Sequence, residues 1–205
     1  MFAHYLARYD GGRYADILLN GDIHQENADK IGITRRQVKT VTYCFLYGGG
    51  NQKLGLSYDN MLSPEKAKKK GAEIRKAYME AIPGLKDLVE ATKKVAEKGT
   101  IRSIDGREIH VNSGHKALNF LLQSSAGVVA KRWCLITDEN LKISNFEHER
   151  YAFVHDEQVL ASPPSLAKYV AFTCKMSAAQ AGEYYKLRIP IAADANIGDN
   201  WAEVH

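Results

Sequence analysis

Cysteine and long apolar segments are both scarce in this chain of 205 residues. The three cysteines, Cys44, Cys134 and Cys174, are widely spaced and form no Cys-x-x-Cys pair. This pattern supports neither a disulfide framework nor a zinc site, and it indicates a reducing, intracellular setting. No apolar run approaches the roughly 18 residues that a membrane span requires. Residues 1–12 also lack the basic start and long apolar core of a signal peptide.

Internal repeats and low-complexity segments are absent as well. Three consecutive glycines, Gly48 to Gly50, are not followed by the Gly-Lys-Ser/Thr of a nucleotide-binding P-loop. We expect them to end a helix at a place where a backbone or a ligand passes closely. The composition, with 45% hydrophobic and 25% charged residues, is typical of a soluble globular protein. A net charge of +4 permits a polyanionic partner without requiring one.

One stretch, residues 34–50, carries a regular ladder of special side chains. Its members follow one another at intervals of four: Arg35, Lys39, Tyr43 and Tyr47. On an α-helix four residues turn about 400°, so the ladder forms one slanting stripe. The opposite side of this helix carries the apolar repeat Val38, Val41 and Phe45. The helix can therefore dock through its apolar face and present the cationic and aromatic stripe to a ligand.

The start of this helix is marked by Thr34 and Gln37, which form a Thr-x-x-Gln capping-box pattern. The unpaired N–H groups and the positive dipole end then lie beside Arg35 and Lys39, an environment that suits phosphates. The two tyrosines lie about 12 to 18 Å further along, where their rings could pack against a sugar and a base. The alternative is a solvated basic face that ends in two tyrosines.

Elsewhere, periodicity and turn residues predict an α+β fold. Helices are expected over residues 1–9, 13–19, 63–80, 84–98, 116–141 and 165–185. Residues 100–111 read as a hairpin with Asp105-Gly106 at its turn. Residues 187–191 read as a strand, and residues 196–205 as an irregular tail. The run Lys66, Lys68, Lys69 and Lys70 is interpreted as a solvated face, with phosphate contact as the less favoured alternative.

Polar residues near two helix starts are further candidates. His24 lies just upstream of the ladder helix and can fold back to its phosphate end. His115, Asn119 and Gln123 fall four apart at the start of the helix predicted for 116–141. Polar side chains in such a row need partners, and the minor-groove edges of DNA are possible ones. Solvent exposure is the alternative.

A second candidate site lies within residues 151–162. Strand-like residues flank His155-Asp156-Glu157, so we expect the acidic pair at the tip of a tight hairpin. One carboxylate can bind Mg²⁺ while the other orients water or backbone. Asp is also common in hairpin turns for geometric reasons alone. Another interpretation takes His155-Asp156 as the dyad of an HD-type metal phosphohydrolase, whose ligands lie on helices; the strand-like flanks weigh against it.

Together these motifs resemble family A DNA polymerases, the DNA polymerase I superfamily, of the phage replicative type. The ladder Arg35-x-x-x-Lys39-x-x-x-Tyr43-x-x-x-Tyr47-Gly48 is similar to motif B of the fingers helix, and His155-Asp156-Glu157 is similar to motif C of the palm. Further similar segments are Asp22-Ile23-His24, Asp105-Gly106-Arg107, Leu118-Asn119, Leu122-Gln123-Ser124 and Gly198-Asp199-Asn200-Trp201. The resemblance covers essentially the whole chain, in the family's order.

The resemblance implies a role for each candidate residue. Arg35, Lys39 and His24 would hold the phosphates of the incoming deoxynucleoside triphosphate, and Lys39 would donate a proton to pyrophosphate. Tyr43 would abut the sugar, an arrangement associated with poor rejection of dideoxynucleotides. The residues implied at the DNA are Tyr47 and Gly48 at the templating base, His115, Asn119 and Gln123 in the minor groove, and His155 at the primer end. Asp156 and Glu157 would serve catalysis, with Asp156 as a metal ligand.

The sequence departs from the family pattern in one respect. Family A enzymes use two metal ions, held by the motif C aspartate and by a second aspartate in motif A, D-x-S-x-x-E-L-R. Residues 1–12 match the palm helix that follows motif A, and the second aspartate is not among the 205 residues. Two-metal transfer needs carboxylates that bridge both ions about 3.5 to 4 Å apart, so Asp156 alone cannot assemble the site.

These observations predict the C-terminal portion of a Mg²⁺-dependent DNA polymerase, with a mostly helical fingers subdomain over 13–110 and a partial antiparallel palm sheet within 111–205. Its expected partners are primer-template DNA, deoxynucleoside triphosphates and a separate N-terminal chain with motif A, a thumb and an exonuclease domain. We expect little synthesis by this chain alone, an exposed palm edge that the partner covers, and a location in the cytoplasm of a bacterial host cell. The alternative is a non-catalytic remnant that binds DNA or nucleotides.

Overall fold

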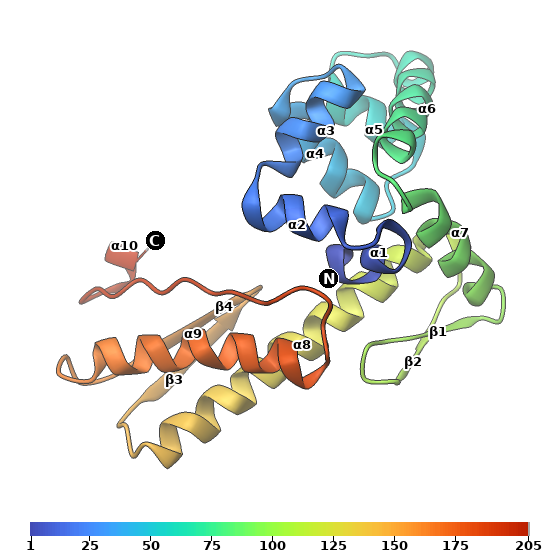
Figure 1. Ribbon diagram of the computed structural model, residues 1–205. Coiled ribbons are helices and arrows are strands. Elements are labelled where there is room, and N and C mark those ends of the chain that lie inside the picture. Colours follow the sequence, from blue (N-terminus) through green and yellow to red (C-terminus); the bar gives the residue numbers. More distant parts are fainter. Residues whose placement is uncertain (205) are drawn as a thin grey trace. The chain divides into compact units, whose positions relative to one another are not determined.

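The computed structural model describes residues 1–204 and separates them into two compact units. The first unit is Met1–Ser125, and the second begins at Ala126. The boundary falls inside one long helix, α8 (Ala117–Ile143), whose first turns belong to the first unit. Most of the described residues are helical and the strands pair only as two antiparallel hairpins, so the predicted α+β class is confirmed (Figure 1).

The first unit consists of seven helices, a hairpin and the start of α8. The helices are α1 (Phe2–Asp10), α2 (Arg13–Asn20), α3 (Ile23–Ile31), α4 (Arg35–Leu46), α5 (Asn51–Tyr58), α6 (Pro64–Ala81) and α7 (Leu85–Ala96). Five of them match the sequence prediction, whereas α3 and α5 were not predicted. Both unpredicted helices are short and bury few apolar side chains, so their hydrophobic periodicity is weak.

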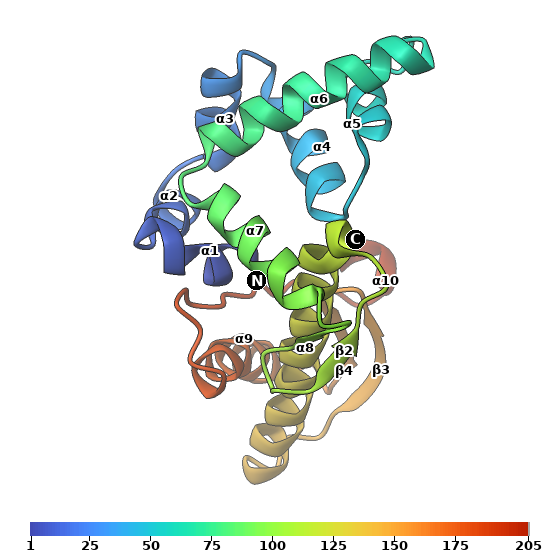
Figure 2. The ribbon, with the colours of Figure 1, turned by 90° about the vertical axis from the view of Figure 1, so that its right-hand side faces the viewer.

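Helix α4 is held in the core of the first unit by its apolar face. Val38 and Val41 are fully buried, and the Phe45 ring lies 5.1 Å from the ring of Tyr78 on α6. Helices α5 and α6 cross closely beside it because glycine replaces side chains at the crossing. A Cβ atom on Gly55 would lie only 1.9 Å from the carbonyl oxygen of Ala67. Figure 2 shows α6 passing both α3 and α5.

The predicted hairpin at 100–111 is present in the first unit. Strands β1 (Thr100–Arg102) and β2 (Glu108–His110) pair antiparallel, with Ile101 opposite Ile109. Gly106, with φ 84°, supplies the left-handed backbone that the turn requires. A 3₁₀ turn, η1 (Gly114–Lys116), then leads into α8. The hairpin covers a small core of Ala96, Ile101, Val111 and Ala117.

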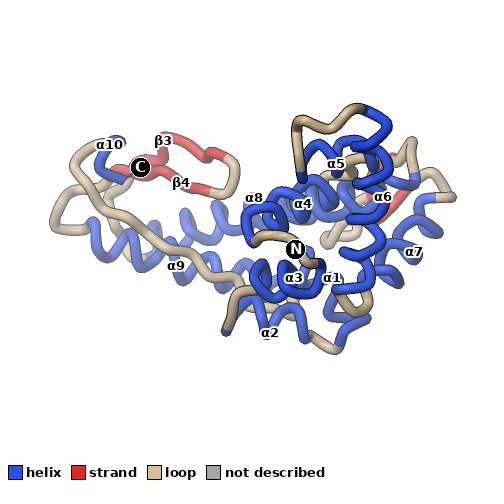
Figure 3. The backbone as a smooth tube through the Cα atoms, turned by 90° about the horizontal axis from the view of Figure 1, so that it is seen from above, coloured by secondary structure: helices blue, strands red, loops and turns tan. Residues whose placement is uncertain are grey.

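The second unit combines the rest of α8 with a hairpin and a second long helix. Strands β3 (Glu149–Val154) and β4 (Glu157–Ala161) pair antiparallel, and α9 (Ala167–Tyr184) follows. The pair β3–β4 is drawn in red in Figure 3. Helices α8 and α9 pack together: Trp133 Nε1 donates to the carbonyl oxygen of Cys174 at 2.8 Å, and Asn140 Nδ2 donates to Ser177 Oγ at 3.0 Å.

Two predictions for the C-terminal segment are wrong. Residues 187–191 do not form a strand: Lys186 turns the chain with φ 51°, Leu187 N bonds back to the carbonyl oxygen of Gly182 at 3.0 Å, and Pro190 has no N–H to donate. The tail is not wholly irregular, because Trp201–Val204 forms the short helix α10. Asn200 caps this helix, its Oδ1 accepting from Ala202 N at 3.1 Å. His205 lies outside the described residues.

Candidate functional site

The ladder occupies the exposed side of α4, as its spacing predicts. Thr34 Oγ1 accepts from Gln37 N at 3.3 Å and Thr34 N donates to Gln37 Oε1 at 2.9 Å, so the predicted capping box is present and starts the helix. All four ladder residues are exposed: Arg35, Lys39, Tyr43 at 50% and Tyr47 at 56%. Two aromatic side chains left half in solvent beside two cations form a surface that a ligand with phosphates and rings would fit.

At the N-terminal end of α4 the structure brings three candidate residues together. Arg35 Nε donates to Asp22 Oδ2 at 2.7 Å, and Asp22 caps α3 by accepting from His24 N at 3.0 Å. The hydrogen bond from Arg35 lowers the pKa of the Asp22 carboxyl. Burial lowers the pKa of the His24 imidazole, and the positive charges of Arg35 and Lys39 lower it further. His24 therefore lies in the field of both cations, as expected of a residue that folds back to this end.

His24 also carries an unsatisfied polar atom. Its Nδ1 is buried and has no hydrogen-bond partner within residues 1–204. Buried polar atoms normally find a partner in a protein, a water molecule or a ligand. An anion held by Arg35 and Lys39 would place acceptors near this ring. This end of α4 is therefore a candidate anion site, in which Arg35 is paired with the Asp22 carboxylate.

At the C-terminal end of α4 the chain meets the start of α8. Asn119 Nδ2 donates to the carbonyl oxygen of Tyr47 at 3.0 Å. A Cβ atom on Gly48, whose φ is 74°, would lie 3.7 Å from the carbonyl oxygen of His115. Four of the residues expected at DNA are thus neighbours. Gln123 is exposed one turn further along α8.

In the second unit, the β3–β4 hairpin carries the other candidate residues. His155 and Asp156 form its two-residue turn, and His155 adopts the left-handed φ of 56°. The expectation of both acidic residues at the tip is wrong for Glu157, which begins β4 and pairs with Val154. The pairing of β3 with β4 therefore extends one residue closer to the turn than the sequence suggested. Because residues 149–161 are strands and turn rather than helix, the structure does not support the HD-type phosphohydrolase interpretation.

A complete metal site is not built from the side chains that the structure describes. Among these residues no group of three or more His, Cys, Asp or Glu side chains is placed to hold a metal ion. Asp156 and Glu157 are exposed neighbours that offer two carboxylates. A hard divalent cation takes about six oxygen ligands, so this pair does not fit a resident metal by itself.

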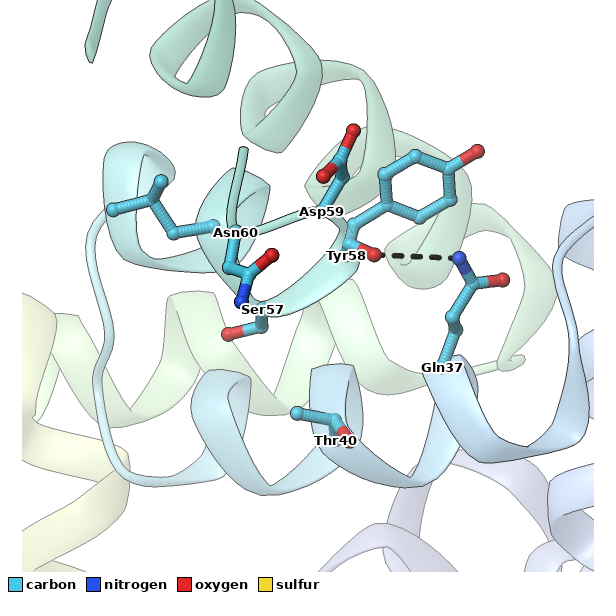
Figure 4. A pocket seen from close by; sticks show the side chains of 7 residues that line it. Gln37, Thr40, Ser57, Tyr58, Asp59 and Asn60 are labelled. Carbon is cyan, nitrogen blue, oxygen red and sulfur yellow. Dashed lines mark hydrogen bonds between the residues drawn. The ribbon is translucent and has the colours of Figure 1, made fainter. Parts of the chain in front are cut away.

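A separate depression of about 540 Å³ lies on another flank of α4, beside the end of α5 (Figure 4). Its lining is mainly polar and includes Gln37, Thr40, Ser57, Asp59 and Asn60. Gln37 Nε2 donates to the carbonyl oxygen of Tyr58 at 3.3 Å across it. The depression contains none of the ladder residues and no cationic side chain. Sequence analysis missed it because it depends on the unpredicted helix α5.

The second unit also exposes an apolar surface that the sequence did not indicate. On α9, Tyr169, Phe172 and Met176 are 60%, 65% and 45% exposed and follow the i, i+3, i+7 spacing of one helix face. On β3, Tyr151, Phe153 and Val154 are exposed as well. The α9 side chains share one helix face and form a candidate interaction surface. The signal available in the sequence was the spacing on α9, which reads equally well as core.

Comparison with known proteins now identifies the family. The model of DNA polymerase family A matches residues 14–203. The chain is 34% identical, over 226 aligned positions, to the DNA-directed DNA polymerase of Enterobacteria phage T3 and equally to that of Escherichia phage T7. It is 26% identical to DNA polymerase I of Pseudomonas aeruginosa, of which it covers 22%. The chain belongs to DNA polymerase family A, which confirms the resemblance drawn from its motifs.

The fold agrees with this assignment. The POL domain of Pol1 from M. smegmatis, a structure in complex with DNA primer-template and dNTP, matches 92% of this chain with a TM-score of 0.74 at 20% identity. This chain covers 35% of that structure and 31% of each of the two phage enzymes. It therefore spans about a third of the length of these relatives. None of the helices described is long and apolar enough to cross a membrane.

Proposed function

We propose that this chain is the C-terminal, nucleotide-positioning portion of a template-directed DNA polymerase that adds deoxynucleotides to a primer 3′ end. The observation that carries the proposal is the arrangement of α4. His24, Arg35 and Lys39 meet at the helix end that favours anions, and Tyr43 and Tyr47 continue the same exposed stripe. This order along the helix matches a nucleotide, whose triphosphate would meet the cations and whose sugar and base would meet the tyrosine rings.

Each residue of the stripe then has a role in the proposed site. Arg35, Lys39 and His24 hold the phosphates, and Lys39 donates a proton to the departing pyrophosphate. Tyr43 lies against the sugar. Tyr47 and Gly48 shape the place of the templating base, supported by the hydrogen bond from Asn119 to Tyr47.

Further DNA contacts are proposed for four polar residues. His115, Asn119 and Gln123 reach the minor groove from η1 and α8, and His155 steadies the primer terminus from the β3–β4 turn. The subdomains proposed are a palm helix over residues 1–12, fingers over 13–110 and a partial palm over 111–205. The solved relative contains DNA primer-template and dNTP, which supports this assignment by analogy.

The proposed catalytic carboxylates are Asp156 and Glu157, with Asp156 as a ligand of Mg²⁺. When bound, two such ions would activate the attacking hydroxyl and neutralise the leaving phosphate. Since the described side chains form no complete metal site, we propose that a separate polypeptide supplies the motif A aspartate, together with a thumb and an exonuclease domain. The exposed face of α9, with Tyr169, Phe172 and Met176, supports a surface that such a partner would cover.

The test is primer extension with Mg²⁺, using this chain alone and then mixed with a polypeptide that carries a D-x-S-x-x-E-L-R segment. We expect no extension by the chain alone and extension by the mixture. Robust synthesis by the chain alone would sink the two-chain proposal.

The absence of a complete metal site among the described residues favours one alternative, a nucleotide-binding remnant. Binding of a dNTP to α4 is measured by the quenching of tyrosine fluorescence, with Thr40→Ala as an exposed control on α4 outside the stripe. Nucleotide binding without synthesis in any mixture would favour the remnant.

A further inference from the structure

The β3–β4 hairpin contains an irregularity that changes which side chains face α8. Arg150 pairs with Leu160 and Ala152 pairs with Val159, so Tyr151 is an extra residue in β3, a β-bulge. In a regular strand, residues three apart point to opposite faces. Here the bulge shifts the alternation by one residue, so that both side chains face α8: the Phe153 ring lies 6.3 Å from that of Trp133, and Arg150 bonds to Asp138.

Arg150 ties both strands to a single turn of α8. Its Nη2 donates to Asp138 Oδ1 at 2.5 Å and to the carbonyl oxygen of Cys134 at 3.1 Å. Its Nη1 donates to Gln158 Oε1 on the neighbouring strand β4. Gln158 Nε2 in turn donates to Thr137 Oγ1 at 3.3 Å. One guanidinium therefore joins β3, β4 and α8.

Arginine suits this place for a geometric reason. The planar guanidinium presents several N–H groups in fixed directions, whereas a lysine ammonium acts as a single charged point on a flexible stem. The side chains of Arg150 and Asp138 are only partly exposed, at 23% and 35%, so water screens their pairing less than on an open surface. A two-stranded hairpin is marginally stable by itself, and contacts to a helix decide whether it holds one register.

We propose that Arg150 is a positioning residue that locks the bulged register of β3–β4 onto α8 and thereby fixes where Asp156 is held. Gln158, which Arg150 contacts, is two residues from Asp156 on the far side of the turn. We call the hydrogen bonds from Arg150 to Asp138, Cys134 and Gln158 the clamp. Loss of the clamp allows the bulge to migrate along β3, and a slip of one residue turns side chains to the opposite face. The functional consequence rests on the proposed role of Asp156, whereas the clamp itself can be tested without synthesis.

The first test measures amide hydrogen exchange in the full chain. In Arg150→Met we expect the amides of Val154 and Glu157 to exchange at least tenfold faster, while amides in α9 keep their rates. The hairpin exchange rates in Arg150→Lys should lie between those of Arg150→Met and the unaltered chain, because a lysine ammonium keeps the charge but cannot bond to Asp138 and Gln158 in the fixed directions of a guanidinium. Lys142→Met removes an exposed cation from α8, the helix that Arg150 contacts. It is the control and should leave the exchange rates of both the hairpin and α9 unchanged.

The second test measures synthesis by the chain mixed with its motif A partner. Arg150→Met should lower kcat at least tenfold and leave the KM for dNTP within twofold, because the residues proposed to bind nucleotide are on or beside α3 and α4. Equal acceleration of exchange in the hairpin and in α9 would show a general loss of stability and overturn the positioning role. So would unchanged exchange in the hairpin.

Failure of the proposed function is distinguishable from failure of the clamp. If no mixture synthesises DNA, yet Arg150→Met accelerates exchange only in the hairpin, the clamp is supported and the polymerase role is not.

Discussion

The α4 stripe and the β3–β4 turn are both candidate sites, but they differ in how much of their chemistry lies on one element. On α4, four candidate side chains follow from one helix with its own cap. Helix α3 adds His24, in the field of Arg35 and Lys39, and α8 adds Asn119 through its hydrogen bond to Tyr47. At the β3–β4 turn, Asp156 is exposed and the described residues supply too few further ligands for a metal.

The difference reflects the chemistry of the two tasks. Phosphate binding uses helix N–H groups and cations spaced along one helix, so a local segment suffices. Two-metal catalysis needs carboxylates from separate segments that bridge two ions about 3.5 to 4 Å apart. The candidate nucleotide site can therefore be nearly complete on one helix while the candidate metal site is incomplete.

The largest expected effect is at the turn. Asp156→Asn should lower synthesis by the mixed enzyme about a thousandfold, because the neutral amide no longer provides the charge that a metal ion requires. The affinity of the chain for dNTP should stay within twofold, because the residues proposed to bind it are on or beside α3 and α4. Single-turnover extension and fluorescence titration measure the two quantities. Synthesis at near-normal rates would remove Asp156 from catalysis.

The next effect concerns the core beneath the stripe. Phe45→Ala should lower the free energy of unfolding of the first unit by about 3 to 5 kcal/mol, since it empties a packed site between α4 and Tyr78. Phe172→Ala, at a 65% exposed position of the second unit, is the control and should change stability by less than about 0.5 kcal/mol. Denaturant titration measures both. Similar decreases in the free energy of unfolding for the two variants would contradict the difference in burial between Phe45 and Phe172.

Alkaline pH should lower the stability of the first unit. Burial, and to a smaller extent Tyr43, raises the pKa of Tyr14 to about 12, and burial raises the pKa of Tyr78 too. Between pH 10 and about 12 the unfolded chain has lost the Tyr14 proton while the folded chain retains it, so stability falls as pH rises. The Tyr14 share of this loss is about 2 to 3 kcal/mol. The free energy of unfolding, measured at several pH values across this window, should fall less steeply with pH in Tyr14→Phe than in the unaltered chain. An equal slope in the two proteins would contradict the raised pKa of Tyr14.

The smallest effects come from two glycines in helices. Gly55→Ala should destabilise the first unit by about 1 to 3 kcal/mol, because its Cβ would meet the Ala67 backbone at the α5–α6 crossing. Gly127→Ala on α8, where nothing lies within 4 Å, should instead stabilise by about 0.5 to 1 kcal/mol. Thermal unfolding measures both shifts. A neutral Gly55→Ala would mean that α5 and α6 separate easily.

Several elements could be predicted because their signals are local. The capping box fixed the start of α4, Asp105-Gly106 marked the first hairpin, and the strand-like flanks of His155 marked the second. Helix α3 escaped prediction although Asp22 caps it, because the segment buries few apolar side chains. The strand expected at 187–191 was wrong because a strand needs a neighbour, and none pairs with it among the described residues.

The sequence by itself determined the family, the composition of the stripe and the side of α4 on which it lies, because helix spacing and motif order are written along the chain. Only the tertiary structure decided that His24 lies in the field of Arg35 and Lys39, and that Asn119 meets Tyr47. It also revealed the bulge that brings Arg150 to α8. These contacts join residues distant in sequence, and they depend on how helices and strands pack rather than on local periodicity.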